Sequence, residues 1–254
     1  MNMQQAKRSP IMIVSLGALL YFALVPPISQ DPAYHLFADT RVFMGIPNFM
    51  NVISNLPFLA VGLWGWLLLN RRRLVHDNEE NYPVYAIFFI GLILTAFGSA
   101  YYHWNPCNNT LVWDRLPMTL SFTAFFVAIL SEHVKPGIER RILYPLIVLG
   151  LFSVIYWYLT ERWLSGDLRL YVLIQFAPLF LIPGVCIKFR SRFTRHRDIY
   201  LVMGFYGLAK IAEYFDRPIF DWTKISGHTW KHLTAALGAF WVLRMLRLRS
   251  KLPQ

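Results

Sequence analysis

The stretch 83-PVYAIFFIGLILTAFGSAYYH-103 decides the fold class, because it runs for 21 residues without an Asp, Glu, Lys or Arg. About 20 mainly apolar residues are enough for a helix to cross the hydrocarbon core of a membrane. Similar runs recur along the chain, which has 254 residues, of which 56% are hydrophobic and 15% charged. A soluble domain of this length is far more polar. We therefore predict an all-α membrane protein.

Apolar runs of sufficient length occur eight times. They cover residues 10-28, 48-70, 83-103, 114-133, 142-160, 168-187, 199-217 and 228-246. We expect the first run to be retained as a membrane span, because it is long for a signal peptide and has no clear cleavage site. With eight spans, both termini lie on the same side of the membrane.

The net charge of +11 is a topology signal, because the basic residues lie in short connections between apolar runs and point to no nucleic-acid partner. Cytoplasmic connections carry an excess of Lys and Arg. One set of connections holds Lys7, Arg8, Arg71, Arg72, Arg73, Lys135, Arg140, Arg141, Lys188, Arg190, Arg192, Arg195, Arg197, Arg244, Arg247, Arg249 and Lys251. The other set holds Arg41, Arg115, Arg162, Arg169, Arg217, Lys224 and Lys231. This asymmetry predicts cytoplasmic termini. The two cysteines, Cys107 and Cys186, are expected near opposite membrane faces and unpaired.

Four histidines fall at the outer ends of the spans: His35, His103, His228 and His232. In 226-SGHTWKHLTAA-236, His228 and His232 are four residues apart, so on a helix both imidazoles share a face and can reach one metal ion. His103 is the candidate third ligand. Three imidazoles with an open fourth position describe a catalytic zinc site. By spacing alone, a metal site and ordinary interfacial hydrogen bonding remain open alternatives.

Two further polar residues are expected at the depth of these histidines. Ser99 lies one helical turn before His103, and Asp114 opens the next apolar run. Asp114 is a candidate to orient an imidazole or to take a proton from water, and Ser99 is a candidate donor to the water or to an oxyanion. The alternatives are that Ser99 packs between helices and that Asp114 caps a helix.

Each of the other intramembrane polar groups has two possible roles. The spacing of Lys210, Glu213 and Asp216 places them along one helical face, where they either form a bracing ion pair or a polar wall near a substrate headgroup. Asn51 and Asn55, one turn apart, either bond between helices or touch the substrate.

The combined pattern resembles the alkaline ceramidases and, more loosely, the wider superfamily of membrane hydrolases that includes the adiponectin receptors. The resemblance rests on Ser99-x3-His103, Asp114 and His228-x3-His232, and on 46-IPNFMNVISNLPFLAVG-62, and runs from about Ala38 to Leu246. It implies seven core helices plus one extra N-terminal helix. The expected division is residues 1-29 for the tail and extra helix, 30-247 for the ceramidase-like domain and 248-254 for a basic tail.

By resemblance, His103, His228 and His232 bind Zn²⁺, Ser99 assists at the oxyanion and Asp114 helps to activate water. The implied activity is hydrolysis of the amide of a ceramide-like N-acyl lipid to a fatty acid and a long-chain base, at a site near the outer leaflet. Eukaryotic alkaline ceramidases also carry a calcium site built from an acidic cluster. The matching region here, 29-48, offers only Asp31 and Asp39 as carboxylates, so no calcium requirement is expected.

Two other functions compete with this interpretation. One is a receptor on the same scaffold with a structural zinc, for which the chain shows no long cytoplasmic tail. The other is a transporter that uses Lys210, Glu213 and Asp216 as a proton relay. The lack of repeat symmetry and of paired broken helices disfavours the transporter.

Overall fold

The computed structural model describes residues 17, 19–75 and 81–253, and these residues form a bundle of helices without a strand. Of the N-terminal run 10-28, residues 10–16 and 18 lie outside the described residues, and residues 19–24 are helical. The elements that follow are η1 (Pro32–His35), α2 (Phe49–Ile53), α3 (Leu56–Asn70), α4 (Tyr82–Trp104), α5 (Asn108–His133), α6 (Glu139–Trp163), α7 (Arg169–Lys188), α8 (Asp198–Tyr214), α9 (Asp216–Thr223) and α10 (Gly227–Leu248).

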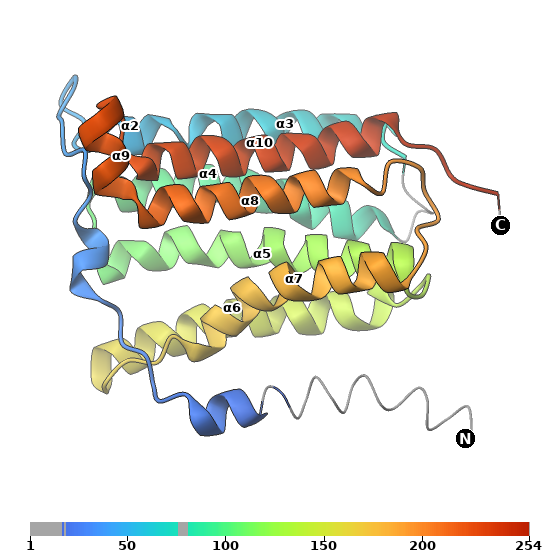
Figure 1. Ribbon diagram of the computed structural model, residues 1–254, viewed down its shortest axis with the longest axis horizontal. Coiled ribbons are helices and arrows are strands. Elements are labelled where there is room, and N and C mark those ends of the chain that lie inside the picture. The colour runs from blue at the N-terminus through green and yellow to red at the C-terminus, as the bar shows by residue number, and fades with distance from the viewer. Residues whose placement is uncertain (1–16, 18, 76–80, 254) are drawn as a thin grey trace.

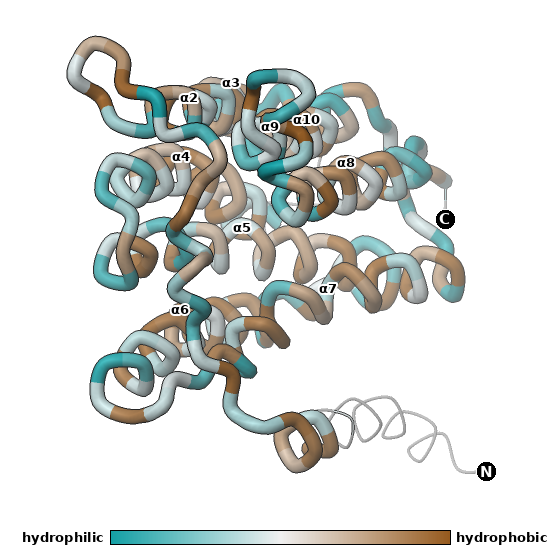
Figure 2. Tube along the Cα trace, turned by 60° about the vertical axis from the view of Figure 1, so that its left-hand side comes forward, coloured by the Kyte–Doolittle hydropathy of each residue, from teal (hydrophilic) through white to brown (hydrophobic). Residues whose placement is uncertain are grey.

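The long helices run side by side, and η1 and α9 lie together at one end of the bundle (Figure 1). Within the described residues, five helical segments are long and apolar enough to cross a membrane: Phe49–Asn70, Tyr82–Trp104, Asn108–His133, Glu139–Trp163 and Arg169–Lys188. Hydrophobic colours follow the helices and hydrophilic colours gather at loops and helix ends (Figure 2). Large apolar side chains such as Phe152, Phe180 and Ile187 are exposed on the outer surface, as expected for helices that face lipid.

The first of these segments is broken between α2 and α3. Pro57 follows the break and stands in the first turn of α3, where its missing N–H costs least. Side chains satisfy backbone carbonyls at the break: Ser54 Oγ donates to the Asn51 carbonyl at 3.1 Å, and Asn55 Nδ2 donates to the same oxygen at 2.9 Å. Such substitution is what allows irregular backbone at membrane depth.

The sequence predicts one helix over the run 199-217. This prediction is wrong for the last residues of the run. Helix α8 ends at Tyr214, and Asp216 begins the separate helix α9. Asp216 is therefore not on the same helical face as Lys210 and Glu213. Cys107 and Cys186 are unpaired, as predicted.

Close helix contacts depend on glycine at two positions near the end of the bundle that carries η1 and α9. A Cβ on Gly98 of α4 would lie 1.9 Å from the Trp113 carbonyl oxygen of α5. A Cβ on Gly227 of α10 would lie 2.1 Å from the Ala212 carbonyl oxygen of α8. These glycines bring Ser99 close to Asp114 and bring His228 close to the end of α8.

The opposite end is closed by a buried ion pair. Arg249, the residue after α10, donates to both carboxylate oxygens of Glu132 on α5 at 2.7 Å, and the two side chains are only 1% and 2% exposed. The Tyr85 hydroxyl donates to the same carboxylate. The pair joins the C-terminal segment to the centre of the bundle.

We expect Glu132→Ala to destabilise the protein by about 3–5 kcal/mol, because it leaves the Arg249 charge buried without its partner. Thermal unfolding in detergent measures the effect. Asp198→Asn is the matched control, since its pair with Arg195 is partly exposed, with side-chain exposures of 32% and 12% for Arg195 and Asp198, and should cost about 1 kcal/mol or less. Equal losses in the two variants would contradict this assignment.

Candidate metal centre

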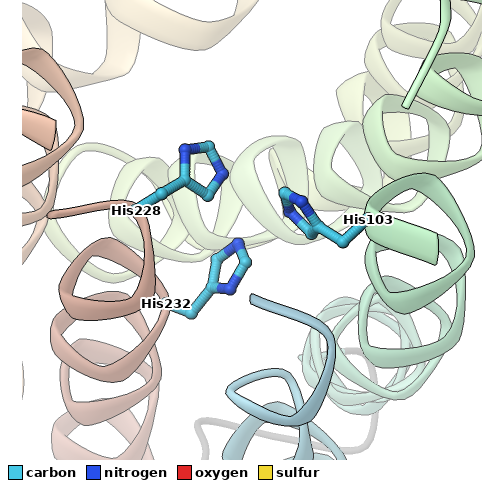
Figure 3. Close-up of side chains that lie close together, drawn as sticks. All are labelled: His103, His228 and His232. Carbon is cyan, nitrogen blue, oxygen red and sulfur yellow. The ribbon is translucent and has the colours of Figure 1, made fainter. Parts of the chain in front are cut away.

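Three histidine side chains from two helices meet at the η1 and α9 end of the bundle. His103 comes from the last turn of α4, and His228 and His232 come from the first turns of α10 (Figure 3). The ring centroids are 4.8 Å apart for His103 with each of the others and 5.0 Å apart for His228 with His232. One potential ligand atom from each residue lies within 4.8 Å of the others. The residues predicted from their spacing are therefore brought together.

The cluster is a good fit for a metal ion. All three side chains are buried, with exposures of 0%, 4% and 3% for His103, His228 and His232. Neither ring nitrogen of His103 has a hydrogen-bond partner among the described residues. Buried polar atoms are normally satisfied, so a shared ion accounts for an otherwise unexplained group. With Zn–N bonds of about 2.0–2.1 Å, ligand nitrogens around a tetrahedral ion stand about 3.3 Å apart, which small side-chain movements achieve.

Ser54 orients one of these rings. The Ser54 hydroxyl donates to the Asn51 carbonyl and lies 2.7 Å from His232 Nδ1. Because the hydroxyl proton is directed to the carbonyl, the oxygen accepts from an Nδ1–H of His232, which leaves the Nε2 lone pair for a metal. Such outer partners select the tautomer of a ligating imidazole.

The start of α10 is held by several hydrogen bonds that place both of its histidines. Ser226 is the N-cap and accepts from the Thr229 N–H at 3.0 Å. Asn51 Oδ1 accepts from the Ser226 and Thr229 hydroxyls at 2.9 and 2.8 Å. Asp216 accepts from the His228 N–H at 2.9 Å and from the Ala38 N–H at 2.8 Å. Asn51 and Asp216 thus hold the start of α10 in place without belonging to the histidine cluster.

Phe37 covers the cluster on the side of the N-terminal segment. Its ring centroid lies 4.7 Å from that of His103 and 4.8 Å from that of His228, and its side chain is buried. The cover restricts water on this side of the cluster.

Ser99 and Asp114 lie next to each other across α4 and α5, and their side chains interact. Both line a cavity of about 150 Å³, which we call the apolar cavity, and His232 and Lys231 line it as well. It continues along α10 as far as Val242, through side chains such as Phe88, Leu92 and Ile182. Ten residues of helix correspond to about 15 Å. Helix α5 begins at Asn108, so Asp114 is inside the helix and is not its cap.

Lys231, which the sequence interpretation counted only as an outer basic residue, is central to the charge arrangement. Its Nζ lies 2.5 Å from Glu213 Oε1, and Lys210 Nζ lies 2.7 Å from Glu213 Oε2. The Tyr34 hydroxyl also donates to Glu213 at 3.1 Å. Lys210 and Glu213 form the ion pair that was one of the two alternatives left open by their spacing, and both lysines also line the apolar cavity.

The remaining predicted residues have other partners. Asn55 bonds to backbone at the break between α2 and α3. His35, the fourth outer histidine, contacts the Tyr102 hydroxyl and Asn108 at 2.9 Å each and stays outside the cluster. Spacing gave no signal for Ser54, because its bonding to His232 depends on how α2 packs against α10.

Asp31 and Asp39 have partners within the protein. Asp31 caps η1 by accepting from the Ala33 N–H. Asp39 pairs with Arg41 at 2.6 Å. Burial alone would raise the pKa of Asp39, but the hydrogen bonds and charge of Arg41 outweigh it and lower that pKa.

Comparison with known families gives one match. A family model described as Ceramidase matches residues 40–215, which is more than half of the chain. The matched range contains Ser99, His103 and Asp114 and ends before the histidine pair of α10. A search of curated proteins finds no match to this chain.

We expect the double variant His228→Ala, His232→Ala to lose its bound metal, because a single remaining imidazole cannot hold an ion tightly. Elemental analysis of purified protein measures the metal per chain. His35→Ala is the matched control at the same end of the bundle and should keep a full complement. Full metal content in the double variant would refute the assignment.

We expect Ser54→Ala to weaken metal affinity by about 10–100-fold, the usual effect of removing an outer partner of a ligating histidine. Competition with a chelator of known affinity measures it. Ser153→Ala is the control, since Ser153 is equally buried but bonds only within its own helix, to the Gly150 carbonyl. An unchanged affinity in Ser54→Ala would show that the His232 ring is oriented without this bond.

Proposed function

The chain belongs to the ceramidase family, and we propose that it is a zinc-dependent amidohydrolase that cleaves the amide of ceramide-like N-acyl lipids. The products are a fatty acid and a long-chain base. Family membership supports ceramide hydrolysis by a multi-pass membrane protein. One observation carries the finer proposal: the cluster of three histidines adjoins the apolar cavity through His232, which lines it together with Asp114 and Ser99.

The proposal includes seven core helices. Besides the five apolar segments, α8 and α10 run along the bundle and pack against each other (Figure 1). The 22 residues of α10 span about 33 Å, enough for the hydrocarbon core. The 17 residues of α8 span about 25 Å, and α9 follows directly. An eighth, N-terminal span remains part of the proposal.

The orientation follows the charge asymmetry. The histidine cluster is at the end of the bundle opposite the connections that carry most of the arginines, such as Arg71, Arg141 and Arg195. The positive-inside tendency supports a site toward the outer face and both termini in the cytoplasm.

The reaction adds water to the amide carbonyl and breaks the C–N bond. When bound by His103, His228 and His232, zinc lowers the pKa of a water ligand and polarises a carbonyl. The Asp114 carboxylate accepts the proton of the attacking water and returns it to the leaving nitrogen, so that the amine departs neutral. The Ser99 hydroxyl donates to the carbonyl oxygen as charge develops there. The acyl chain lies in the apolar cavity, which excludes water along its length.

Calcium has no part in the proposal. The two carboxylates of the region before α2 are already used, one as a helix cap and the other in a pair with Arg41. Calcium sites are usually built from several oxygen ligands with more anionic charge.

We expect Asp114→Asn to keep its zinc and lose about 100-fold or more in turnover, the usual scale for general acid-base catalysis. Ser99→Ala should lose a similar amount or less, since one oxyanion donor is worth about 3 kcal/mol. Zinc content and release of fatty acid from a panel of N-acyl lipids, with and without a chelator, are measured on the same preparations.

Asp221→Asn is the control for this experiment, because Asp221 is an exposed carboxylate on α9 at the same end of the bundle. It should match the wild type. If wild-type protein with its zinc cleaves none of the lipid amides, or if Asp114→Asn and Ser99→Ala leave turnover unchanged, the hydrolase proposal gives way to a receptor with a structural metal.

A further inference from the structure

Arg115, the neighbour of Asp114 on α5, is buried without an ionic partner. The residue is only 5% exposed. One amino group donates to Gln30 Oε1 at 2.7 Å, and the other, Nη1, has no hydrogen-bond partner among the described residues. No carboxylate in the described part of the chain forms a salt bridge with it.

Three aromatic rings surround this guanidinium. Its central carbon lies 4.2 Å from the ring centroid of Trp157, 4.8 Å from that of Tyr171 and 5.6 Å from that of Tyr34. Cation–π contacts stabilise a desolvated cation, but they leave the N–H donors unused. A buried charge is normally both paired and hydrogen-bonded. The Nη1 group of Arg115 is therefore left without a hydrogen-bond acceptor, and the guanidinium charge is left without a neutralising carboxylate, among the described residues.

Arg115 lines a second cavity, of about 170 Å³, which we call the polar cavity. Its other lining residues include Tyr34, Tyr171, Gln175, Lys210 and Lys231. A cavity of about 10–15 Å³ by the same kind of measure holds one water, so there is room for a group of several atoms.

The charges around the polar cavity do not balance. Three cations, Arg115, Lys210 and Lys231, line it. Glu213 pairs with both lysines, and Asp114 is the carboxylate among the residues that line the cavity. Even with both carboxylates ionised, one positive charge remains in excess, and Arg115 is the cation without a direct partner.

The polar and apolar cavities share part of their walls. Asp114, Met118, Gln175, Lys210 and Lys231 line both of them. The two cavities are therefore adjacent, and a molecule that occupies both places an apolar chain in one and a polar group in the other.

We propose that the polar cavity binds an anionic group on the amine side of the substrate, with Arg115 as its main contact. The substrate class is then an N-acyl lipid whose amine portion carries a carboxylate or a phosphate. This inference rests on the proposed hydrolase function and deepens it. Arg115 presents planar donors that suit both anions, and the excess charge at the cavity favours either over a neutral headgroup.

Binding of matched amphiphiles tests the proposal independently of turnover. The ligands are N-dodecanoylglycine, its methyl ester and N-dodecanoylethanolamine, which share the acyl amide and differ in the anionic group. Dodecanoate tests whether the anion that the site recognises is simply the carboxylate of a fatty acid. Stopped-flow tryptophan fluorescence of the full-length protein in detergent follows binding before hydrolysis.

Wild-type protein should bind N-dodecanoylglycine at least about tenfold more tightly than the ester and the ethanolamide. Arg115→Gln should reduce this preference to about twofold or less, and Arg115→Lys should keep part of it. Arg162→Gln is the control, because Arg162 is exposed at the same end of the bundle. Near-wild-type thermal stability shows that the variants are folded.

Equal binding of the charged and neutral amides by the wild type would overturn the proposal, even if Arg115→Gln fails to fold. Equal loss of all ligands in a folded Arg115→Gln would overturn it as well, since Arg115 would then only support the fold. Dodecanoate binding as tightly as N-dodecanoylglycine in the wild type, with the same dependence on Arg115, would assign the site to the released acid.

Turnover of the same amides separates this inference from the proposed function. Charge preference in binding without any hydrolysis would leave the anion site standing and remove the hydrolase. Hydrolysis without charge preference would support the hydrolase function and overturn the anion site.

Discussion

The hydrogen bonds at the first turn of α10 are the interaction on which the rest of the site depends. Asn51 accepts from two hydroxyls of that turn, and Asp216 accepts from its backbone at His228. This turn carries His228, and the next turn carries Lys231 and His232, so the position of α10 sets two candidate metal ligands and the lysine together. Gly227 allows the approach, because any side chain there would collide with the end of α8. A small shift of α10 would misplace several groups at once.

Charge pairing explains how an apolar bundle contains so many ionisable groups. Glu132 with Arg249 closes one end, and Glu213 with two lysines lies near the other. In each case the cost of burial is offset by short, multiple hydrogen bonds. Arg115 departs from this rule, and the departure coincides with a cavity. An unbalanced buried charge in the wall of a cavity marks a candidate binding site.

The two cavities match the two parts of an amide lipid, its apolar acyl chain and its polar amine portion. The apolar cavity extends from His232 along α10 and suits an acyl chain, and the polar cavity holds tyrosines, lysines and Arg115. Asp114 lies in the wall that both share, at the place where an amide would separate the two halves of the substrate. In the proposed mechanism this position of Asp114 would link substrate recognition to proton transfer.

The amino-acid sequence by itself determined the helical class, the approximate limits of the long helices and the shared helical face of His228 and His232, and it indicated His103 as a candidate third member of their cluster. Run length, charge and four-residue spacing are local properties, and a helix converts them directly into position. It also indicated Ser99 and Asp114, although their roles remain proposals.

Only the tertiary structure decided which polar groups meet. Ser54 reaches His232, Lys231 joins Glu213, and Asp216 leaves the face of Lys210 because α8 ends at Tyr214. That Arg115 forms no salt bridge with a carboxylate of the described residues is equally invisible in the sequence, where it directly follows Asp114. These contacts depend on the packing and rotation of helices distant in the chain, and no local pattern specifies either.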